Sequence, residues 1–325
     1  MSAGHGCYKD AARPLSAAID EDRHPRFPRL GSVDHAGSFS MRPRFAPLFL
    51  AAVFGFGAHV GIERPAAAVS LDDHATPGGM IIGTAPPGSQ VSVDGRLVRI
   101  SDDGRFVFGV GRNGEGQVSV VVDPPKGEKI TRTVVIDKRG YDIQRIDGLP
   151  ARKVEPNKDD QARIETDWVM LNEAKATDSA ILAFAEGAVW PVTGRISGVF
   201  GSQRILNGKP KSPHRGVDVA APVGTPVGAM MDGVVTVAAT DMYYTGGTVM
   251  VDHGHGIQSL YAHLSAVDVK VGQQLDKGQQ LGLIGATGRA TGPHLHFSLY
   301  WFKTALDPAL ILDPMPEPQK AAGTQ

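Results

Sequence analysis

His294-Leu-His-Phe-Ser-Leu299 is one of four strand-like runs in the second half of the chain, and these runs decide the expected fold. The other three are Gly233-Val-Val-Thr-Val237, Thr248-Val-Met-Val-Asp252 and Gln258-Ser-Leu-Tyr261. Glycine-rich turns separate the runs, and short apolar runs between glycines are typical of β structure. We therefore expect a mainly β protein in which residues 190–314 form an antiparallel β-sheet domain with its own core.

A second group of strand-like runs lies in the first half of the chain. Gln90-Val-Ser-Val-Asp94 alternates and is followed by an Asp-Gly turn signal. Arg105-Phe-Val-Phe108, Gln117-Val-Ser-Val-Val-Val122 and Ile130-Thr-Arg-Thr-Val-Val-Ile136 follow at near-regular spacing. This spacing predicts a small β-sandwich module over residues 75–150. The module carries no catalytic cluster, so we interpret it as a spacer or docking module.

Residues 156–188 have a different pattern and predict a helical connector between the two β regions. Apolar residues recur at helix spacing in two places, which are Ile164, Trp168 and Leu171, and then Ile181, Leu182 and Phe184. Thr177-Asp178 interrupts the pattern and could cap a second helix. We expect a helical hairpin or a bent helix in which Trp168 is packed.

Length and composition narrow the functional class. The chain has 325 residues, which suits about two domains with linkers, and a formal net charge of -1. A near-neutral chain offers no bulk charge for binding nucleic acid, so no nucleic-acid partner is expected. The only cysteine is Cys7, so no intramolecular disulfide can form. A metal site must therefore use His, Asp and Glu.

The N-terminal segment has the pattern of a secretory signal peptide. A basic start at Met41-Arg-Pro-Arg44 precedes an apolar run over 46–58 and the small residues Pro65-Ala-Ala-Ala68. We assign residues 41–68 to the signal and interpret residues 1–40 as a non-native or disordered extension. The alternative is an uncleaved anchor, the one case in which membrane association is expected. Residues 315–325 predict a disordered tail.

Two short motifs carry side chains suited to one metal ion: His214-Arg-Gly-Val-Asp218 and His294-Leu-His296. In a strand, residues i and i+2 share a face, so His294 and His296 should face one cleft while Leu295 faces the core. A loop-to-strand transition near Gly216 could bring His214 and Asp218 onto the same ion. Catalytic zinc sites use three such ligands and keep one position open for a water of lowered pKa. His263 lies between the motifs, and the histidines left over could transfer protons or stabilise an oxyanion.

The chain resembles the lysostaphin-type (LytM-like) zinc metallopeptidases, which cut peptidoglycan cross-bridges, over much of residues 194–308. The resemblance rests on His214-Arg-Gly-Val-Asp-Val-Ala-Ala-Pro222, on Tyr261-Ala-His-Leu264 and on Gly288-Arg-Ala-Thr-Gly-Pro-His-Leu-His-Phe297. It implies that His214, Asp218 and His296 bind Zn²⁺ and that His263 and His294 are the catalytic histidines. None of these five positions departs from the family pattern.

The resemblance implies a zinc-dependent endopeptidase that hydrolyses peptide cross-links of bacterial peptidoglycan through a metal-activated water. Its partners would be peptidoglycan stem peptides, and its place the periplasm or cell envelope, as in secreted Gram-negative members. A D-alanyl-to-diamino-acid bond is the expected target, with glycine bridges left open. One alternative is a catalytically silent wall-binding regulator that activates another cell-wall hydrolase. Another is an enzyme whose β module hides the active site. The sequence leaves the oligomeric state open.

Three further sets of residues could each have a functional or a structural role. Arg204 and Arg289 could meet carboxylates of a stem peptide or be ordinary surface arginines. Tyr243 and Tyr244 could line a substrate groove or pack in the core. A second His-x-His pair, His253 and His255, is interpreted as part of a hairpin turn and not as a metal site.

Overall fold

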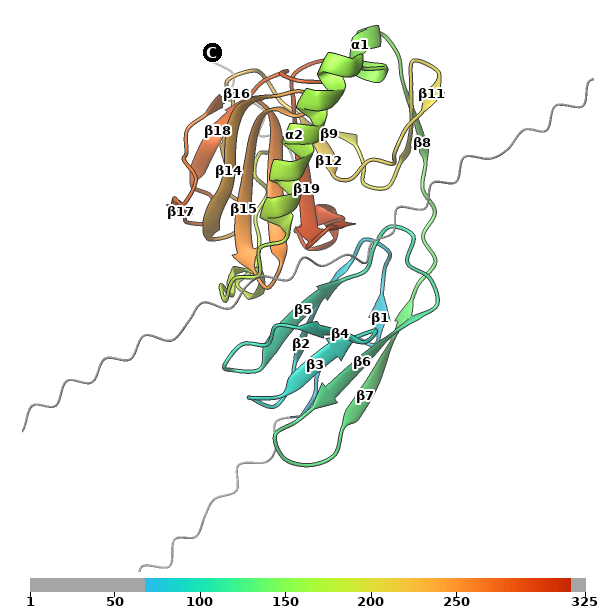
Figure 1. Cartoon of the computed structure of the whole chain (residues 1–325), viewed down its shortest axis with the longest axis vertical. Helices are drawn as coiled ribbons and strands as arrows, with labels where there is room; N and C mark the ends of the chain where they lie inside the picture. The colour runs from blue at the N-terminus through green and yellow to red at the C-terminus, as the bar shows by residue number, and fades with distance from the viewer. Residues whose placement is uncertain (1–67, 317–325) are drawn as a thin grey trace, which may run out of the picture. The chain divides into compact units, whose positions relative to one another are not determined.

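The computed structural model describes residues 68–316. The predicted extension, the signal segment up to residue 67, and the tail from residue 317 lie outside this range. Strands dominate the described part of the chain, so the predicted mainly β fold is confirmed (Figure 1). Within residues 68–316, no helix combines the length and the apolar character that crossing a membrane requires.

The first β region consists of seven short strands. A five-stranded sheet has the order β1-β7-β6-β3-β4, and β2 pairs with β5 in a separate two-stranded sheet. Alternate side chains such as Val91, Val120 and Val122 are completely buried, as expected for strands with one face toward a core. The bounds are β1 His74–Ala75, β2 Met80–Thr84, β3 Gln90–Val93, β4 Arg96–Val98, β5 Arg105–Gly109, β6 Gln117–Asp123 and β7 Ile130–Ile136.

The next strand, β8 (Ile143–Ile146), pairs elsewhere. It runs parallel to β10 (Gln203–Leu206), which also pairs with β11 (Lys209–Pro210). The predicted sandwich region extended to residue 150, whereas β8 shares a three-stranded sheet with residues of the second β region. A small apolar cluster beside this sheet consists of Leu149, Val154 and Leu206. Burial of these side chains stabilises the position of β8 next to β10.

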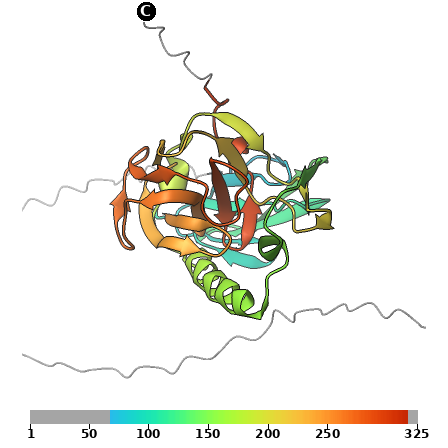
Figure 2. The same ribbon diagram turned by 90° about the horizontal axis from the view of Figure 1, so that it is seen from above.

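The connector contains one long helix. α1 (Ala151–Val154) is a single turn, and α2 (Lys158–Lys175) begins at a capping box in which Asn157 and Asp160 satisfy each other's backbone N–H groups. The second helix that was predicted is only the 3₁₀ turn η1 (Ala183–Ala185). Figures 1 and 2 both show α2 alongside the large sheet, where it contacts β14.

The prediction that Trp168 packs in the interior is wrong, because its side chain is 61% exposed. The inward stripe of α2 keeps Ile164 and Leu171 as predicted, but its middle position is Asp167 instead of Trp168. Asp167 accepts a hydrogen bond of 2.7 Å from the backbone N–H of Tyr243, so a carboxylate takes the place that helix spacing gave to the indole. Spacing alone does not reveal such a polar anchor.

The second β region is a large antiparallel sheet, as predicted, with the order β17-β14-β15-β16-β19-β12-β9. β13 pairs with β18, β18 also pairs with β16, and β20 pairs with β19. Its core holds Tyr261, Phe297 and Met250, all fully buried. The bounds are β9 Arg195–Gly198, β12 Val217–Ala220, β13 Pro226–Gly228, β14 Gly233–Met242, β15 Gly246–Gly254, β16 Ile257–Val267, β17 Gln274–Leu275, β18 Gln280–Ile284, β19 His294–Trp301 and β20 Thr304–Leu306, followed by the 3₁₀ turn η2 Pro308–Leu310.

Candidate active site

Strand register brings Asp218 next to His296. β12 and β19 are antiparallel, and in their ladder Asp218 lies opposite His296 while Val219 lies opposite Leu295. Side chains that face each other across such a ladder have Cβ atoms about 4.5–5.5 Å apart. Leu295 is completely buried, whereas the rings on either side of it reach the other face. His294 and His296 thus share a face, as the alternation predicted.

His214 reaches the same place from the loop that precedes β12. Its backbone N–H donates to the carbonyl of Ser202 at 2.9 Å, and its carbonyl accepts from the N–H of Gly201 at 2.9 Å. At Gly216 a Cβ atom would lie 2.2 Å from the carbonyl oxygen of Phe297, so only glycine lets this loop approach β19 so closely. The transition from loop to strand therefore lies at Gly216, as predicted, with β12 beginning at Val217.

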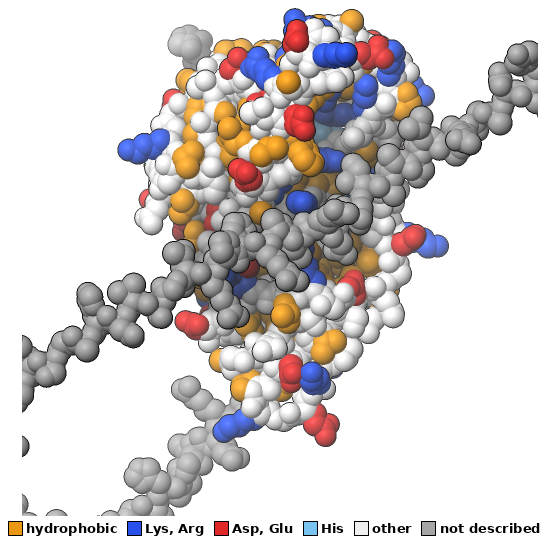
Figure 3. All heavy atoms as spheres, in the orientation of Figure 1, with side chains coloured by type: hydrophobic (Ala, Val, Ile, Leu, Met, Phe, Trp, Pro, Cys, Tyr) orange, Lys and Arg blue, Asp and Glu red, His pale blue; other side chains and the backbone are white. Residues whose placement is uncertain are grey.

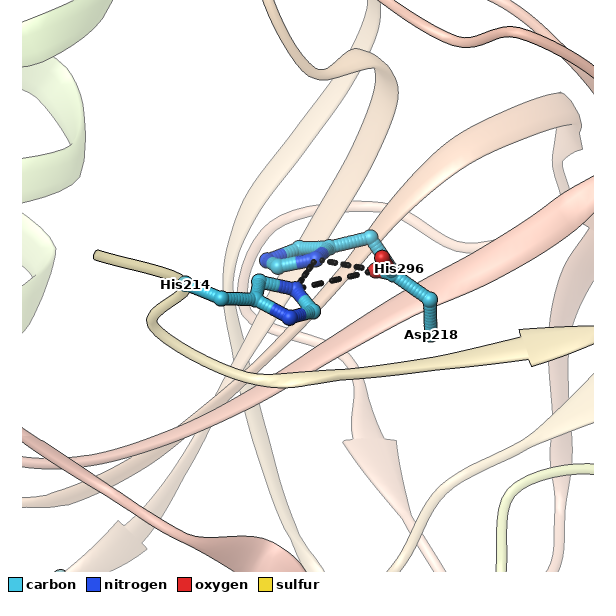
Figure 4. A group of neighbouring side chains, drawn as sticks. All are labelled: His214, Asp218 and His296. Carbon is cyan, nitrogen blue, oxygen red and sulfur yellow. Dashed lines mark hydrogen bonds and ion pairs between the residues drawn. The ribbon is translucent and has the colours of Figure 1, made fainter. Parts of the chain in front are cut away.

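Three ligand-type atoms converge from these elements (Figure 4). His214 Nε2 lies 3.0 Å from His296 Nδ1 and 3.0 Å from Asp218 Oδ1, and His296 Nδ1 lies 2.8 Å from the same oxygen. The ligand atoms of a tetrahedral ion with bonds near 2.1 Å are about 3.4 Å apart, so a small movement of these side chains would fit them around one small cation. Within residues 68–316 this is the one group of three such side chains placed to share a metal ion.

The outer nitrogens of both imidazoles are already engaged. His214 Nδ1 lies 3.0 Å from the carbonyl of Val199, to which it donates, and this leaves Nε2 with a free lone pair. His296 Nε2 lies 2.9 Å from Ser298 Oγ, so its Nδ1 is the nitrogen directed at Asp218. Such outer hydrogen bonds select the tautomer and fix the ring of a metal-binding histidine.

Asp218 is buried and held from two sides. Its Oδ1 faces the imidazoles, and its Oδ2 accepts a 2.7 Å hydrogen bond from Arg204 Nη2. Burial alone would raise the pKa of this carboxyl, but the hydrogen bonds with His214 and His296 outweigh burial and hold the pKa well below its usual range. Burial also lowers the pKa of His296 to about 4, so its ring is neutral at pH 7 and able to bind a metal.

His263 and His294 flank this cluster, with ring centroids 4.7 Å apart. Each donates its Nδ1 proton to a backbone carbonyl at 2.8 Å, of Thr287 for His263 and of Gly292 for His294. The remaining nitrogen of each ring, Nε2, is therefore the basic one. For His294 this atom lies 3.9 Å from Asp218 Oδ1. Burial lowers the pKa of His263 to about 3.

A backbone irregularity orients His263. It belongs to β16, where alternation would put it on the same face as Tyr261, whose buried hydroxyl accepts from the N–H of Met230 at 2.8 Å. Its φ angle is +65°, which is uncommon for a residue other than glycine. This left-handed residue breaks the alternation, so Tyr261 stays in the core while His263 borders a cavity. Such strain concentrates at functional sites.

An open cavity of about 270 Å³, called here the active-site cavity, lies beside the cluster. Asp218, His263 and His294 form part of its wall. Three arginines and the segment of residues 143–149, called here the β8 segment, complete it. These residues are Arg195, Arg204 and Arg289, with Gln144, Ile146 and Leu149. Figure 3 shows blue Lys and Arg side chains close to the pale blue of histidine on the described surface.

The remaining candidate residues take different places. Tyr243 is buried, and its hydroxyl donates to the carbonyl of Arg152 at 2.7 Å, so it packs. Tyr244 lies under the guanidinium of Arg289, 4.3 Å from its ring centroid. His255 occupies the turn between β15 and β16 with φ +51°, as interpreted from the sequence. His253 does not lie in the turn, because it is a fully buried residue of β15.

Sequence reasoning missed two contributors to the site. It placed Arg204 on the surface or at the substrate, whereas Arg204 pairs with Asp218. It overlooked Gly198, which lies opposite Asp218 in the ladder and where a Cβ would meet Asp218 Oδ2 at 2.4 Å. An arginine or a glycine near a ligand has no local pattern, since its role depends on pairing between distant strands.

The part of the chain that carries this site is similar to known peptidases. The family described as peptidase family M23 matches residues 212–308. The chain is 46% identical over 106 residues to the peptidoglycan DD-endopeptidase ShyA of Vibrio cholerae, which covers 32% of this chain and 24% of ShyA. It is 37% identical over 147 residues to the cell division protein DipM of Caulobacter vibrioides, covering 45% of this chain and 23% of DipM. The matches thus span about a quarter of the length of these curated relatives.

A solved structure extends the likeness beyond the matched domain. The crystal structure of a candidate M23 peptidase from Pseudomonas aeruginosa has 31% sequence identity and a TM-score of 0.56. The similarity covers 73% of this chain and 94% of that one. It therefore includes residues outside the second β region. With the family match, this near-complete coverage of a relative shows that the chain belongs to peptidase family M23.

Proposed function

We propose that the protein is a zinc-dependent endopeptidase that hydrolyses peptide cross-links of bacterial peptidoglycan in the cell envelope. The observation that carries this proposal is the convergence of His214 Nε2, Asp218 Oδ1 and His296 Nδ1 within 3.0 Å of one another. Two nitrogens and one oxygen match the donors that zinc takes in hydrolytic sites. We assign these three atoms as the ligands.

When bound there, zinc supplies a Lewis acid that polarises a peptide carbonyl and lowers the pKa of a water. The chain's own residues do the rest. Because His263 and His294 both give Nδ1–H to backbone carbonyls, their Nε2 atoms are free to exchange protons at the cavity. We assign to this pair the removal of a proton from the attacking water, its delivery to the leaving amine and the stabilisation of the developing oxyanion.

The substrate assignment follows from the relatives. ShyA is named a peptidoglycan DD-endopeptidase, and the DD-carboxypeptidase/endopeptidase Mpg of Neisseria meningitidis is 43% identical to this chain over 104 residues. We therefore propose that the bond cut is the D-alanyl cross-link between two stem peptides. The cavity, open to solvent and rich in arginine, suits a peptide that carries free carboxylates.

One digest tests the proposal. The protein without residues 1–68 is loaded with zinc and incubated with purified peptidoglycan, with and without a chelator, and the products are read by mass spectrometry. We expect a loss of cross-linked dimers that the chelator abolishes and that zinc restores. Intact dimers after incubation with folded, zinc-loaded protein would contradict an endopeptidase.

DipM is named a cell division protein and not an endopeptidase, so the similarity to it leaves room for a relative without peptidase activity. The second candidate is therefore a regulator that binds the wall or a wall hydrolase. A regulator leaves purified dimers intact but increases the rate of an added hydrolase. The complete set of His214, Asp218, His263, His294 and His296 supports the enzyme, because a silent regulator has no need of five groups in catalytic array.

A further inference from the structure

We propose that Arg289 binds a carboxylate of the substrate peptide and so selects substrates in which that carboxylate is free. This inference rests on the proposed function, because it assigns a substrate contact within the same cavity. Arg289 precedes β19, and each residue from Arg289 to His294 contributes to the cavity wall. A group bound by Arg289 would therefore lie along the path that leads to His294.

The side chain of Arg289 is held in place from two directions. Its backbone N–H donates to the carbonyl of Tyr244 at 2.8 Å, and its guanidinium stacks over the ring of Tyr244 with the carbon Cζ 4.3 Å from the ring centroid. Gly288 allows this approach, because a Cβ there would lie 2.4 Å from the same carbonyl. Stacking fixes the plane of the guanidinium and leaves its edge, where the N–H groups are, available to a planar acceptor.

The hydrogen bonds of the guanidinium are largely unused within the described residues. An arginine carries five N–H donors, and the one acceptor found for Arg289 is the carbonyl of Lys153, 3.4 Å from Nη1. No ion pair joins Arg289 to a carboxylate of residues 68–316. Its side chain is nevertheless half-buried, and burial together with the nearby charge of Arg204 lowers its pKa. A cation in such a place is stabilised by an anion from outside.

The other charges of the cavity do not supply that anion. Asp218 is the one carboxylate in the wall, and its oxygens are committed to Arg204 and to the histidine cluster. Arg195, on the neighbouring strand β9, adds another positive charge and forms no ion pair within the described residues. The cavity thus carries more positive than negative charge even with Asp218 ionised.

Carboxylate is the ligand that fits these features. Arginine binds carboxylates through two parallel N–H···O bonds, and a stacked guanidinium loses little freedom in forming them. A cross-linked stem peptide offers two sources of this group, which are the terminal carboxylate of D-alanine and the side-chain carboxylate of the diamino acid. Both present the same planar anion, so a binding experiment must separate them.

The test compares three synthetic stem tetrapeptides by calorimetry on the zinc-loaded protein without residues 1–68. One peptide has both carboxylates free, one has its terminal carboxylate amidated, and one has the diamino-acid carboxylate amidated. We expect wild type to bind one of the amides at least about tenfold more weakly than the free peptide, equal to about 1.4 kcal/mol. The amide that loses affinity names the carboxylate. In Arg289→Gln the three peptides should bind within about twofold of one another.

Two controls keep the test specific. Arg289→Lys retains the charge without the planar fork and should keep part of the preference. Arg132→Gln removes an exposed arginine of β7 remote from the cavity wall and should bind all three peptides as wild type does. Zinc content of each variant shows that the site is intact.

Cleavage of cross-linked dimers, measured in parallel, separates the two proposals. A wild type that cleaves dimers but binds the three peptides equally would overturn the carboxylate subsite and leave the endopeptidase standing. The same holds if Arg289→Gln keeps the full preference. A wild type that neither cleaves nor binds would overturn both.

Discussion

At the scale of single residues, we assign two roles to the five polar groups of the site. His214 and Asp218 direct their ligand atoms at each other and at His296, whereas His263 and His294 direct theirs at the cavity. We expect His214→Ala and Asp218→Ala to lose bound zinc. His263→Ala and His294→Ala should retain zinc while turnover falls by at least about 100-fold. Zinc per chain and the rate of dimer cleavage check this, and equal zinc loss in all four variants would contradict the division.

We expect Arg204 to act as a positioning residue and not as a ligand. It fixes Oδ2 of Asp218 at 2.7 Å, while its Nε donates to Gln144 Oε1 at 3.3 Å. Removing an outer partner of a ligand costs about 10- to 100-fold in metal affinity. We expect Arg204→Met to weaken zinc binding by this factor, measured by competition with a chelating dye, and Arg204→Lys to recover part of it. Unchanged affinity in Arg204→Met would show that the pair only contributes to packing.

At the scale of elements, a buried chain of hydrogen bonds links β15 to β16 within the large sheet. His253 lies 2.7 Å from the carbonyl of Asp232 through Nδ1 and 2.7 Å from Ser259 Oγ through Nε2, and Ser259 in turn contacts the hydroxyl of Tyr261 at 3.0 Å. With Nδ1–H donated to the carbonyl, Nε2 must accept the serine proton. A second proton on His253, at Nε2, would remove the acceptor for the serine proton. Burial lowers the pKa of His253 to about 4, so the ring stays neutral at pH 7.

The chain of hydrogen bonds predicts acid sensitivity of stability. The unfolded chain has a histidine pKa near 6.5, so below that pH it takes up a proton that the folded protein refuses. The contribution of neutral His253 is therefore fully present above pH 6.5 and is lost as the pH falls toward 4, by up to about 3 kcal/mol. His253→Gln should flatten this part of the pH dependence, measured by urea unfolding at several pH values. An equal slope in the variant and in wild type would contradict the assignment.

The strands and the helix also differ in how much of their structure could be predicted from the sequence. The strand runs around His253 and His294 could be predicted, because alternation and glycine turns reflect which face of a strand is buried. The inward face of α2 could not, because Asp167 and not Trp168 contacts the sheet. For the site, the i, i+2 rule placed His294 and His296 correctly. The left-handed turn of the backbone at His263 has no signal in sequence, since it depends on packing around Tyr261.

At the scale of the whole described chain, the first β module and the β8 segment contact the large sheet in different ways. The module touches the edge of the site through Arg112, whose Nε donates to the carbonyl of Gly201 at 2.6 Å. The β8 segment forms part of the active-site cavity itself through Gln144, Ile146 and Leu149. Because the module and the cavity wall come from different parts of the chain, a shortened chain can lack the module and still keep the wall.

Two shortened chains test whether the first module hides the active site or the β8 segment completes it. A chain that begins at residue 142 keeps β8, whereas one that begins at residue 188 loses it and exposes Leu206, which packs against Leu149. Because β8 supports Arg204 through Gln144, we expect the longer chain to cleave dimers within about twofold of the protein that lacks only residues 1–68. The shorter chain should cleave more slowly and bind zinc more weakly. Faster cleavage by both shortened chains would instead show that the module covers the site, because removing a cover raises the rate whether or not the wall remains.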